Sequence, residues 1–162
     1  MDLAPHVPEE ARKYFEQAYS AQMQGRLDEA TTLYKQSIAI YPTAEAHTFL
    51  GWVYSMQRRW EEAIAQCHIA IGVDHDFGNP YNDIGAYLME LGRLAEAIPW
   101  FERAKRAARY EPRHYPHLNL SRVHIIQNDI PAAVRELRAV VEIEPAHTAA
   151  RRELHRLLGM LN

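Results

Sequence analysis

Histidine and carboxylate side chains are the residues of this chain that could bind a metal ion. The 162-residue sequence contains nine histidines. His114 and His117 are spaced to share one turn of a helix, and Asp74-His75-Asp76 is a compact polar segment. Zinc requires three or four ligands in a fixed geometry, and neither cluster offers more than part of such a set. We therefore predict structural roles for these histidines, with no metal and no other cofactor.

The sequence has no arrangement of residues typical of an enzyme active site. It contains no glycine-rich phosphate-binding loop, no Gly-x-Ser-x-Gly elbow and no His-Glu-x-x-His pair. These motifs place a nucleophile, a phosphate cradle or a metal at a defined position, and nothing else in the chain would replace them. We predict that the protein is not an enzyme.

A basic stretch in the second half is a candidate surface for RNA or for an acidic protein. It contains Arg103, Lys105, Arg106, Arg109 and Arg113. The first 77 residues hold 6 basic and 11 acidic side chains, whereas residues 78–162 hold 12 and 10. Only Tyr110 and Tyr115 lie close enough in sequence to stack on bases, and charge runs usually form solvated helix surface. We favour the solvated surface and keep nucleic acid as the weaker alternative.

The overall composition is that of one globular domain. The hydrophobic fraction is 48%, the charged fraction 24% and the formal net charge −3, all near the averages for globular proteins. The single cysteine, Cys67, cannot form an internal disulfide. No apolar run approaches the ~20 residues of a membrane-spanning helix. We expect a soluble, cytoplasmic protein with no membrane partner.

A six-residue motif recurs along the chain and divides it into four units. Residues 25–30 (Gly-Arg-Leu-Asp-Glu-Ala) recur at 92–97 (Gly-Arg-Leu-Ala-Glu-Ala), with related segments at 58–63 and 128–133. The first residues of successive copies are 33, 34 and 36 positions apart. A second marker, Tyr41-Pro42 and later Glu144-Pro145, has the matching spacing. The units therefore begin near residues 11, 44, 78 and 114.

Each unit is predicted to be a helical hairpin. A small residue lies twelve positions before an alanine in each one, so that two helices can pack closely; the pairs are Ala18 and Ala30, Gly51 and Ala63, Gly85 and Ala97, and Ser121 and Ala133. Between them a left-handed residue is expected to end the first helix, at Gly25, Arg58, Gly92 and Asn128. The predicted helices are 9–24, 27–40, 44–57, 60–73, 78–91, 94–110, 114–127, 130–143 and 146–160. Two extra residues in the third unit are interpreted as a longer helix and an altered turn.

The period and residues resemble the tetratricopeptide repeat. In the second unit the resemblance rests on Leu50-Gly51, Tyr54, Ala63 and Ala70, and in the third on Ile84-Gly85, Ala97, Phe101 and Ala104. It implies an all-α fold, an α-solenoid of about four helix–turn–helix units over residues 9–147. We expect an irregular arm at 1–8 and a capping helix at 148–162, which presents Leu154, Leu157, Leu158 and Leu161.

The resemblance also implies that the first helices of the units line a concave, ligand-binding face. At the family's ligand-contacting positions this chain has many apolar residues. We predict that partner binding uses Phe15, Tyr19, Phe49, Trp52, Met56 and Met89 as apolar anchors, with Asn82, Asn119 and Arg122 orienting the ligand. Methionine and aromatic residues are typical of adaptable binding surfaces.

The function predicted from these residues is a non-enzymatic protein–protein interaction module. It would bind a peptide or helix in an apolar concave groove, as a scaffold, an adaptor or a small chaperone. Self-association through the groove, or stacking of solenoids into a homo-oligomer, is the structural alternative. A third interpretation places the apolar side chains between helices, or lets Leu3 and Val7 of the arm fold back into the groove.

Overall fold

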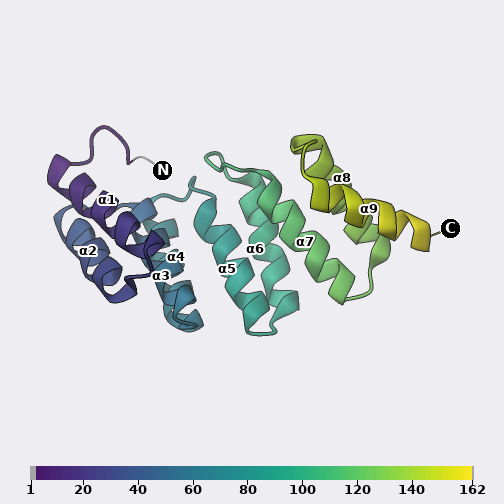
Figure 1. Ribbon diagram of the computed structural model, residues 1–162, viewed down its shortest axis with the longest axis horizontal. Helices are drawn as coiled ribbons and strands as arrows, with labels where there is room; N and C mark the ends of the chain where they lie inside the picture. Colours follow the sequence, from purple (N-terminus) through teal and green to yellow (C-terminus); the bar gives the residue numbers. More distant parts are fainter. Residues whose placement is uncertain (1–2, 162) are drawn as a thin grey trace.

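The computed structural model describes residues 3–161, and these residues form nine α-helices arranged as a row of antiparallel hairpins (Figure 1). The helices are α1 (Glu9–Met23), α2 (Leu27–Ile40), α3 (Ala44–Met56), α4 (Trp60–Val73), α5 (Asn79–Glu90), α6 (Leu94–Arg106), α7 (His114–Ile126), α8 (Ile130–Ile143) and α9 (Thr148–Met160). Helices α1–α8 pair in sequence order, and α9 packs on α8. The predicted all-α solenoid is confirmed.

The two helices of each hairpin approach closely at the small residues that the sequence pattern picked out. Ala30, Ala63, Ala97 and Ala133 are fully buried. A Cβ atom on Gly51 would lie 3.0 Å from the carbonyl oxygen of Ala63, and one on Gly85 would lie 2.5 Å from Cε1 of Phe101. Because no larger side chain fits there, these positions set the spacing of the helices.

Left-handed residues end the first helix of each hairpin, as predicted. Gly25 and Gly92 both have a φ of 74°, Arg58 has 60° and Asn128 has 58°. Glycine adopts this conformation without steric cost, and asparagine tolerates it better than most residues. Arg58 has a Cβ atom and lacks the tolerance of asparagine, so the turn of the second unit is the most strained of the four.

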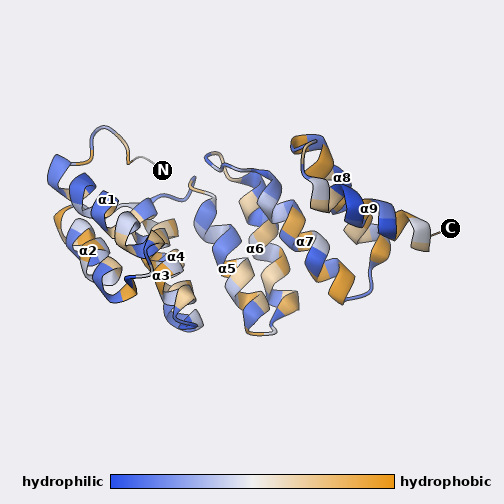
Figure 2. Cartoon of the chain, viewed as in Figure 1, coloured by the Kyte–Doolittle hydropathy of each residue, from blue (hydrophilic) through white to orange (hydrophobic). Residues whose placement is uncertain are grey.

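The first helices of successive units form the inner side of the array. Helix α1 contacts α3, α3 contacts α5 and α5 contacts α7, whereas the second helices make no comparable contacts with one another. Each helix carries hydrophobic and hydrophilic residues together (Figure 2). Apolar side chains on α3, α5 and α7 therefore pack on the partner helix or on the second helix of the preceding unit, as Tyr87 does on Trp60, or lie on the inner face.

The third unit differs from the sequence prediction. Helix α6 was expected to continue to residue 110, but it ends at Arg106, and Ala107 already has an extended backbone. The extra residues form a loop, 107–113, in which the Glu111–Pro112 peptide bond is cis. This loop reaches back to the segment before α5, where Phe77 and Arg109 form a parallel β-bridge. The longer-helix interpretation was wrong because these residues bond across the repeat instead of along the helix.

The two ends of the described chain are covered in different ways. Leu3 and Val7 of the arm are buried in the main core. Leu157 of α9 is buried against α8, with Leu154 and Leu158 partly buried beside it. Leu161, which was expected on the same apolar face, is 52% exposed. No helix within residues 3–161 is both long enough and apolar enough to span a membrane.

Replacing Gly85 with alanine should destabilise the fold. The new methyl group would collide with the fully buried ring of Phe101, and such overpacking costs about 1–3 kcal/mol. As a control, alanine at Gly72 of α4 meets no atom within 4 Å and should stabilise the protein by about 0.5–1 kcal/mol. Urea denaturation followed by circular dichroism measures both. A Gly85→Ala protein as stable as the parent would contradict the close packing.

Candidate functional site

An aromatic cluster runs from α1 to α3 across the inner side. The ring of Phe49 lies edge-on to three others, with centroid distances of 5.4 Å to Phe15, 5.7 Å to Tyr19 and 5.7 Å to Trp52. The same Phe15 ring also lies edge-on to Tyr34 of α2, at 5.6 Å. Edge-to-face pairs at this distance are favourable beyond the area they bury. The cluster therefore extends from the core of the first unit to the surface.

Members of the aromatic cluster differ in exposure. Tyr19 is 40% exposed and Trp52 is 39% exposed, and Met56, one helical turn beyond Trp52, is 45% exposed. Phe15 is only 3% exposed, so it supports Phe49 from beneath and does not line the surface. Phe49 is partly buried between them. Tyr19, Trp52 and Met56 thus present exposed apolar surface, whereas Phe15 belongs to the core.

Gln22 is a buried residue that the family positions would place on the inner face. It is 1% exposed, its Oε1 accepts a hydrogen bond of 2.8 Å from the Tyr34 hydroxyl, and its Nε2 donates to Sδ of Met56 at 3.6 Å. Met56 is thereby held against α1 although it remains exposed. This link joins the first two units beneath the apolar surface.

The polar residues predicted to orient a ligand form one network between α5 and α7. The Nδ2 of Asn119 donates to Oδ1 of Asn82 at 3.0 Å, and Arg122 Nη1 donates to Oδ1 of Asn119 at 3.3 Å. Asn82 is 8% exposed, whereas Arg122 is exposed. Met89, also on α5, is partly buried against the main core. The sequence analysis assigned these three residues a shared role in orienting a ligand, and the structure adds that they bond one another and that Asn82 is largely covered.

A pocket of about 370 Å³ opens on the inner side beside the aromatic cluster. It lies between α3, α5, the start of α7 and the 107–113 loop. The residues that line it are Thr48, Phe49, Trp52, Ser55, Asn79, Asn82, Asp83, Tyr87, Tyr110, Pro112 and Tyr115. Three of these, Phe49, Trp52 and Asn82, were named from the sequence. Tyr110 and Tyr115 were named only as possible stacking partners for bases, and Pro112 was not named, because residues up to 110 were expected to be helical.

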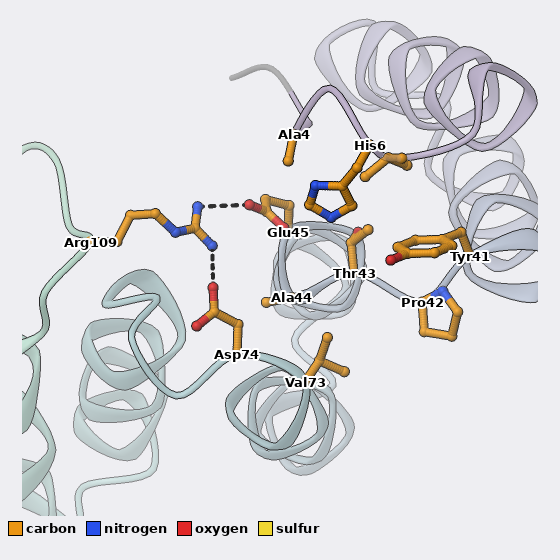
Figure 3. A pocket seen from close by; sticks show the side chains of 11 residues that line it. Ala4, His6, Tyr41, Pro42, Thr43, Ala44, Glu45, Val73, Asp74 and Arg109 are labelled. Carbon is orange, nitrogen blue, oxygen red and sulfur yellow. Dashed lines mark hydrogen bonds and ion pairs between the residues drawn. The ribbon is translucent and has the colours of Figure 1, made fainter.

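Arg109 fixes this loop across the second unit. Its guanidinium donates to Glu45 Oε1 at 2.8 Å and to Asp74 Oδ2 at 2.6 Å, and it enters a second pocket of about 450 Å³ opposite His6 and Tyr41 (Figure 3). Burial, the largest single influence, would raise the pKa of Asp74, but the hydrogen bonds from the Arg109 side chain and the Asp76 backbone, together with the positive charge of Arg109, lower that pKa below its usual value. Arg109 therefore ties the third repeat to the beginning of α3 and the end of α4.

Backbone hydrogen bonds and a close contact complete the attachment of the loop. The Gly78 N–H donates to the Arg109 carbonyl, and the Arg109 N–H donates to the Asp76 carbonyl, each at 2.9 Å. A Cβ atom on Gly78 would lie 2.4 Å from Cβ of Tyr110. Tyr110 is buried, so the loop packs directly on the segment before α5. Because of this contact, Tyr110 and Pro112 line one side of the inner pocket.

Asp83 is the one acidic residue of the inner pocket. Burial raises its pKa to about 7, although the hydrogen bond from the Asn82 side chain acts in the opposite direction. The residue keeps some exposed surface on the pocket side, but the protein around it is dense enough to penalise its charge. No basic side chain among residues 3–161 forms an ion pair with it.

Residues that the sequence offered for metal or nucleic-acid binding contact other side chains of the protein. His117 Nδ1 lies 2.6 Å from Glu136 Oε2, and Lys105 binds the same glutamate at 3.2 Å. Arg103 lies over the rings of Tyr81 and Trp100, at 4.9 and 4.7 Å from their centroids. No group of three or more His, Cys, Asp or Glu side chains in residues 3–161 could hold a metal ion. Burial raises the pKa of the Cys67 thiol well above its usual value.

Helical hairpins of about 34 residues with this packing define the class of helix–turn–helix repeat proteins. Family models described as tetratricopeptide repeat match residues 15–72, 81–109 and 114–139. The chain belongs to the tetratricopeptide repeat family, whose members generally mediate protein–protein interactions and are typically non-catalytic. The resemblance inferred from the sequence is confirmed.

Solved structures show the same fold at low sequence identity. PilF from Pseudomonas aeruginosa superposes with a TM-score of 0.86 at 20% identity, over 94% of this chain and 69% of that one. YrrB, described as a TPR protein with an unusual peptide-binding site, gives a TM-score of 0.68 at 20% identity, over 93% and 77% of the two chains. The protein O-mannosyl-transferase Tmtc1 of Drosophila melanogaster is 30% identical over 123 residues. That match covers 72% of this chain but only 14% of the length of Tmtc1.

The raised pKa of Asp83 predicts a pH-dependent stability. The folded state holds a proton that the unfolded state, with a carboxyl pKa near 3.9, releases. The free energy of unfolding should therefore fall as the pH rises from about 4 to 7. The isosteric Asp83→Asn change should raise stability by about 3–4 kcal/mol at pH 8 and by almost nothing at pH 4. Urea denaturation at the two pH values measures this, and an equal effect at both would show that the carboxyl is not perturbed.

Proposed function

We propose that this chain is a non-enzymatic interaction module whose inner face binds a peptide or a short helix of a partner protein. The observation that carries the proposal is the exposure of Tyr19, Trp52 and Met56, which lie side by side on the first two inner helices. The partly buried ring of Phe49 connects them. Tyr115 and Ile126 add exposed apolar surface further along, on α7.

Exposed apolar surface of this kind has an energetic cost that a partner would remove. Fully burying one large apolar side chain stabilises a protein by about 1.5–3 kcal/mol. The described arm does not cover the surface, because Leu3 and Val7 pack into the core while Tyr19 and Trp52 stay exposed. Contiguous apolar patches on monomers are most often interaction sites, and tryptophan and tyrosine are frequent binding hot spots.

The remaining named residues have supporting roles in the proposed site. Phe15 positions Phe49 from beneath, and the Asn82–Asn119 pair offers amide groups that can bond a partner's backbone. Arg122, at the exposed end of that pair, is free to contact an acidic group. The scaffold, adaptor and chaperone roles would all use this one mode of binding.

The cytoplasmic location and the domain boundaries inferred from the sequence stay predictions.

Replacing Trp52 with alanine should abolish most peptide binding while the helical fold is retained. The test probes an immobilised library of random twelve-residue peptides with the purified chain. We expect the Trp52→Ala protein to bind at least about tenfold more weakly, since central tryptophans often contribute 2 kcal/mol or more. Because Trp52 is already 39% exposed, its removal should lower the melting temperature by only a few degrees.

Ile69→Ala is the matched control for this experiment. Ile69 is 46% exposed on α4, a second helix outside the inner face, so its removal should leave peptide binding unchanged. Equal loss of binding in both variants would contradict the proposed site. Light scattering of the chain alone tests the alternative: a Trp52-dependent dimer would indicate that the inner face binds a second copy of the chain.

A further inference from the structure

The inner pocket has an unusual charge balance for a surface rich in aromatic residues. Trp52 and Tyr115, which are 39% and 45% exposed, line it from α3 and α7, and Asp83 contributes a carboxylate. No lysine, arginine or histidine lines the pocket. An acidic group among aromatic rings, without a basic neighbour, favours a cation.

Two arginines close to the pocket do not line it. Arg109, on the loop that forms one wall, donates to Glu45 and Asp74 on the far side of the loop. Arg122 contacts the pocket only indirectly, through Asn119 and Asn82. The protein therefore supplies no positive charge of its own to compensate Asp83. A carboxylate that is both desolvated and unpaired is costly to ionise, and a bound cation would remove that cost.

Asn79 is a second acceptor at the same place. It lines the pocket, and its Oδ1 is buried without a hydrogen-bond partner among the described residues. Buried polar atoms are nearly always bonded in native proteins, so an unpartnered acceptor favours a ligand that brings a donor. A guanidinium group offers five N–H donors and a flat face that stacks on aromatic rings, whereas an ammonium group offers three donors.

We propose that the pocket between α3, α5 and the 107–113 loop binds the cationic side chain of an arginine or lysine in the partner segment. Asp83 forms the ion pair, Trp52 and Tyr115 hold the cationic group between their rings, and the apolar cluster of Tyr19, Phe49 and Met56 receives the neighbouring hydrophobic side chain. This assignment rests on the proposed function, because it names the chemistry of the peptide that the inner face would take. The partner segment is thus basic and hydrophobic together.

The probes for the test are Nα-acetyl-arginine methylamide and its neutral isostere, Nα-acetyl-citrulline methylamide. Each is titrated at pH 8 into the full chain while the Trp52 indole N–H resonance is followed by NMR. We expect the arginine compound to bind about tenfold more tightly than the citrulline compound. The Asp83→Asn protein should lose most of this preference and keep only the smaller part that the aromatic rings provide.

Glu90→Gln is the matched control, since it removes the same charge from an exposed position of the same helix, outside the pocket. This variant should keep the preference for arginine. Equal binding of the two compounds by the unaltered chain, or an undiminished preference in Asp83→Asn, would overturn the assignment. Loss of the preference in Glu90→Gln as well would show that the preference is a general effect of net charge, and this result would also overturn the assignment.

The pH dependence of the arginine titration is a second readout. Binding should tighten about tenfold from pH 6 to pH 8 as Asp83 ionises. The other titratable side chains around it are Cys67 of α4, Tyr87 of α5, Tyr110 of the loop and Tyr115 of α7. Burial raises the pKa of Cys67, Tyr87 and Tyr110, so these three stay uncharged over this range. Affinity that does not change with pH would contradict the role of Asp83.

The peptide library separates failure of this assignment from failure of the proposed function. Peptides that bind through Trp52 without enrichment in arginine or lysine would refute the cationic pocket and leave the interaction module intact. If the arginine compound binds through Asp83 but no peptide binds, the pocket chemistry stands and the interaction module is refuted.

Discussion

The attachment of the 107–113 loop to the second repeat is the interaction on which the inner pocket depends. Arg109 bridges Glu45 and Asp74, two backbone hydrogen bonds join the loop to the segment before α5, and Tyr110 packs on Gly78. Exposed ion pairs contribute little on their own, typically up to about 1 kcal/mol. Here Glu45 is largely buried, so removing Arg109 would leave a covered carboxylate without its partner.

The rest of the inner face follows from the way the hairpins stack. Close packing at Gly51 and Gly85 sets the distance between the two helices of a unit, and the first helices of successive units then contact one another. The stacked first helices place Tyr19, Phe49 and Trp52 in one row that the protein only partly covers. The same geometry supports the fold and leaves an apolar surface, which is the physical basis for proposing a binding site there.

Much of the fold could be predicted from the sequence because it is determined locally. The left-handed conformations follow from the repeated turn position, as at Arg58 and Asn128. Close packing of the helices follows from repeated small residues such as Gly51 and Ala63. Both features lie within one hairpin and do not depend on distant residues. The site was predicted less well. Phe15 and Asn82 occupy family binding positions, but their burial depends on which neighbouring side chains lie over them, and periodicity does not contain that information.

The loop of the third unit was the least predictable element, for a clear physical reason. Residues 107–110 continue a helical pattern locally, yet the backbone of Arg109 bonds to Asp76 and Gly78, about 30 positions earlier in the sequence. Asp83 was likewise not picked out from the sequence. Its importance comes from burial beside aromatic rings and from the absence of a basic partner within residues 3–161, and both are tertiary properties.

Amide hydrogen exchange of an Arg109→Ala protein tests most directly whether this loop is held in place as described. The account predicts that the amides of Gly78 and residue 109 exchange at least about tenfold faster than in the parent, while the amides in the middle of α3 and α5 keep their protection. The Arg106→Ala protein, which loses an exposed arginine of α6 near the loop, should match the parent. Unchanged protection at Gly78 and residue 109 in Arg109→Ala would contradict the account.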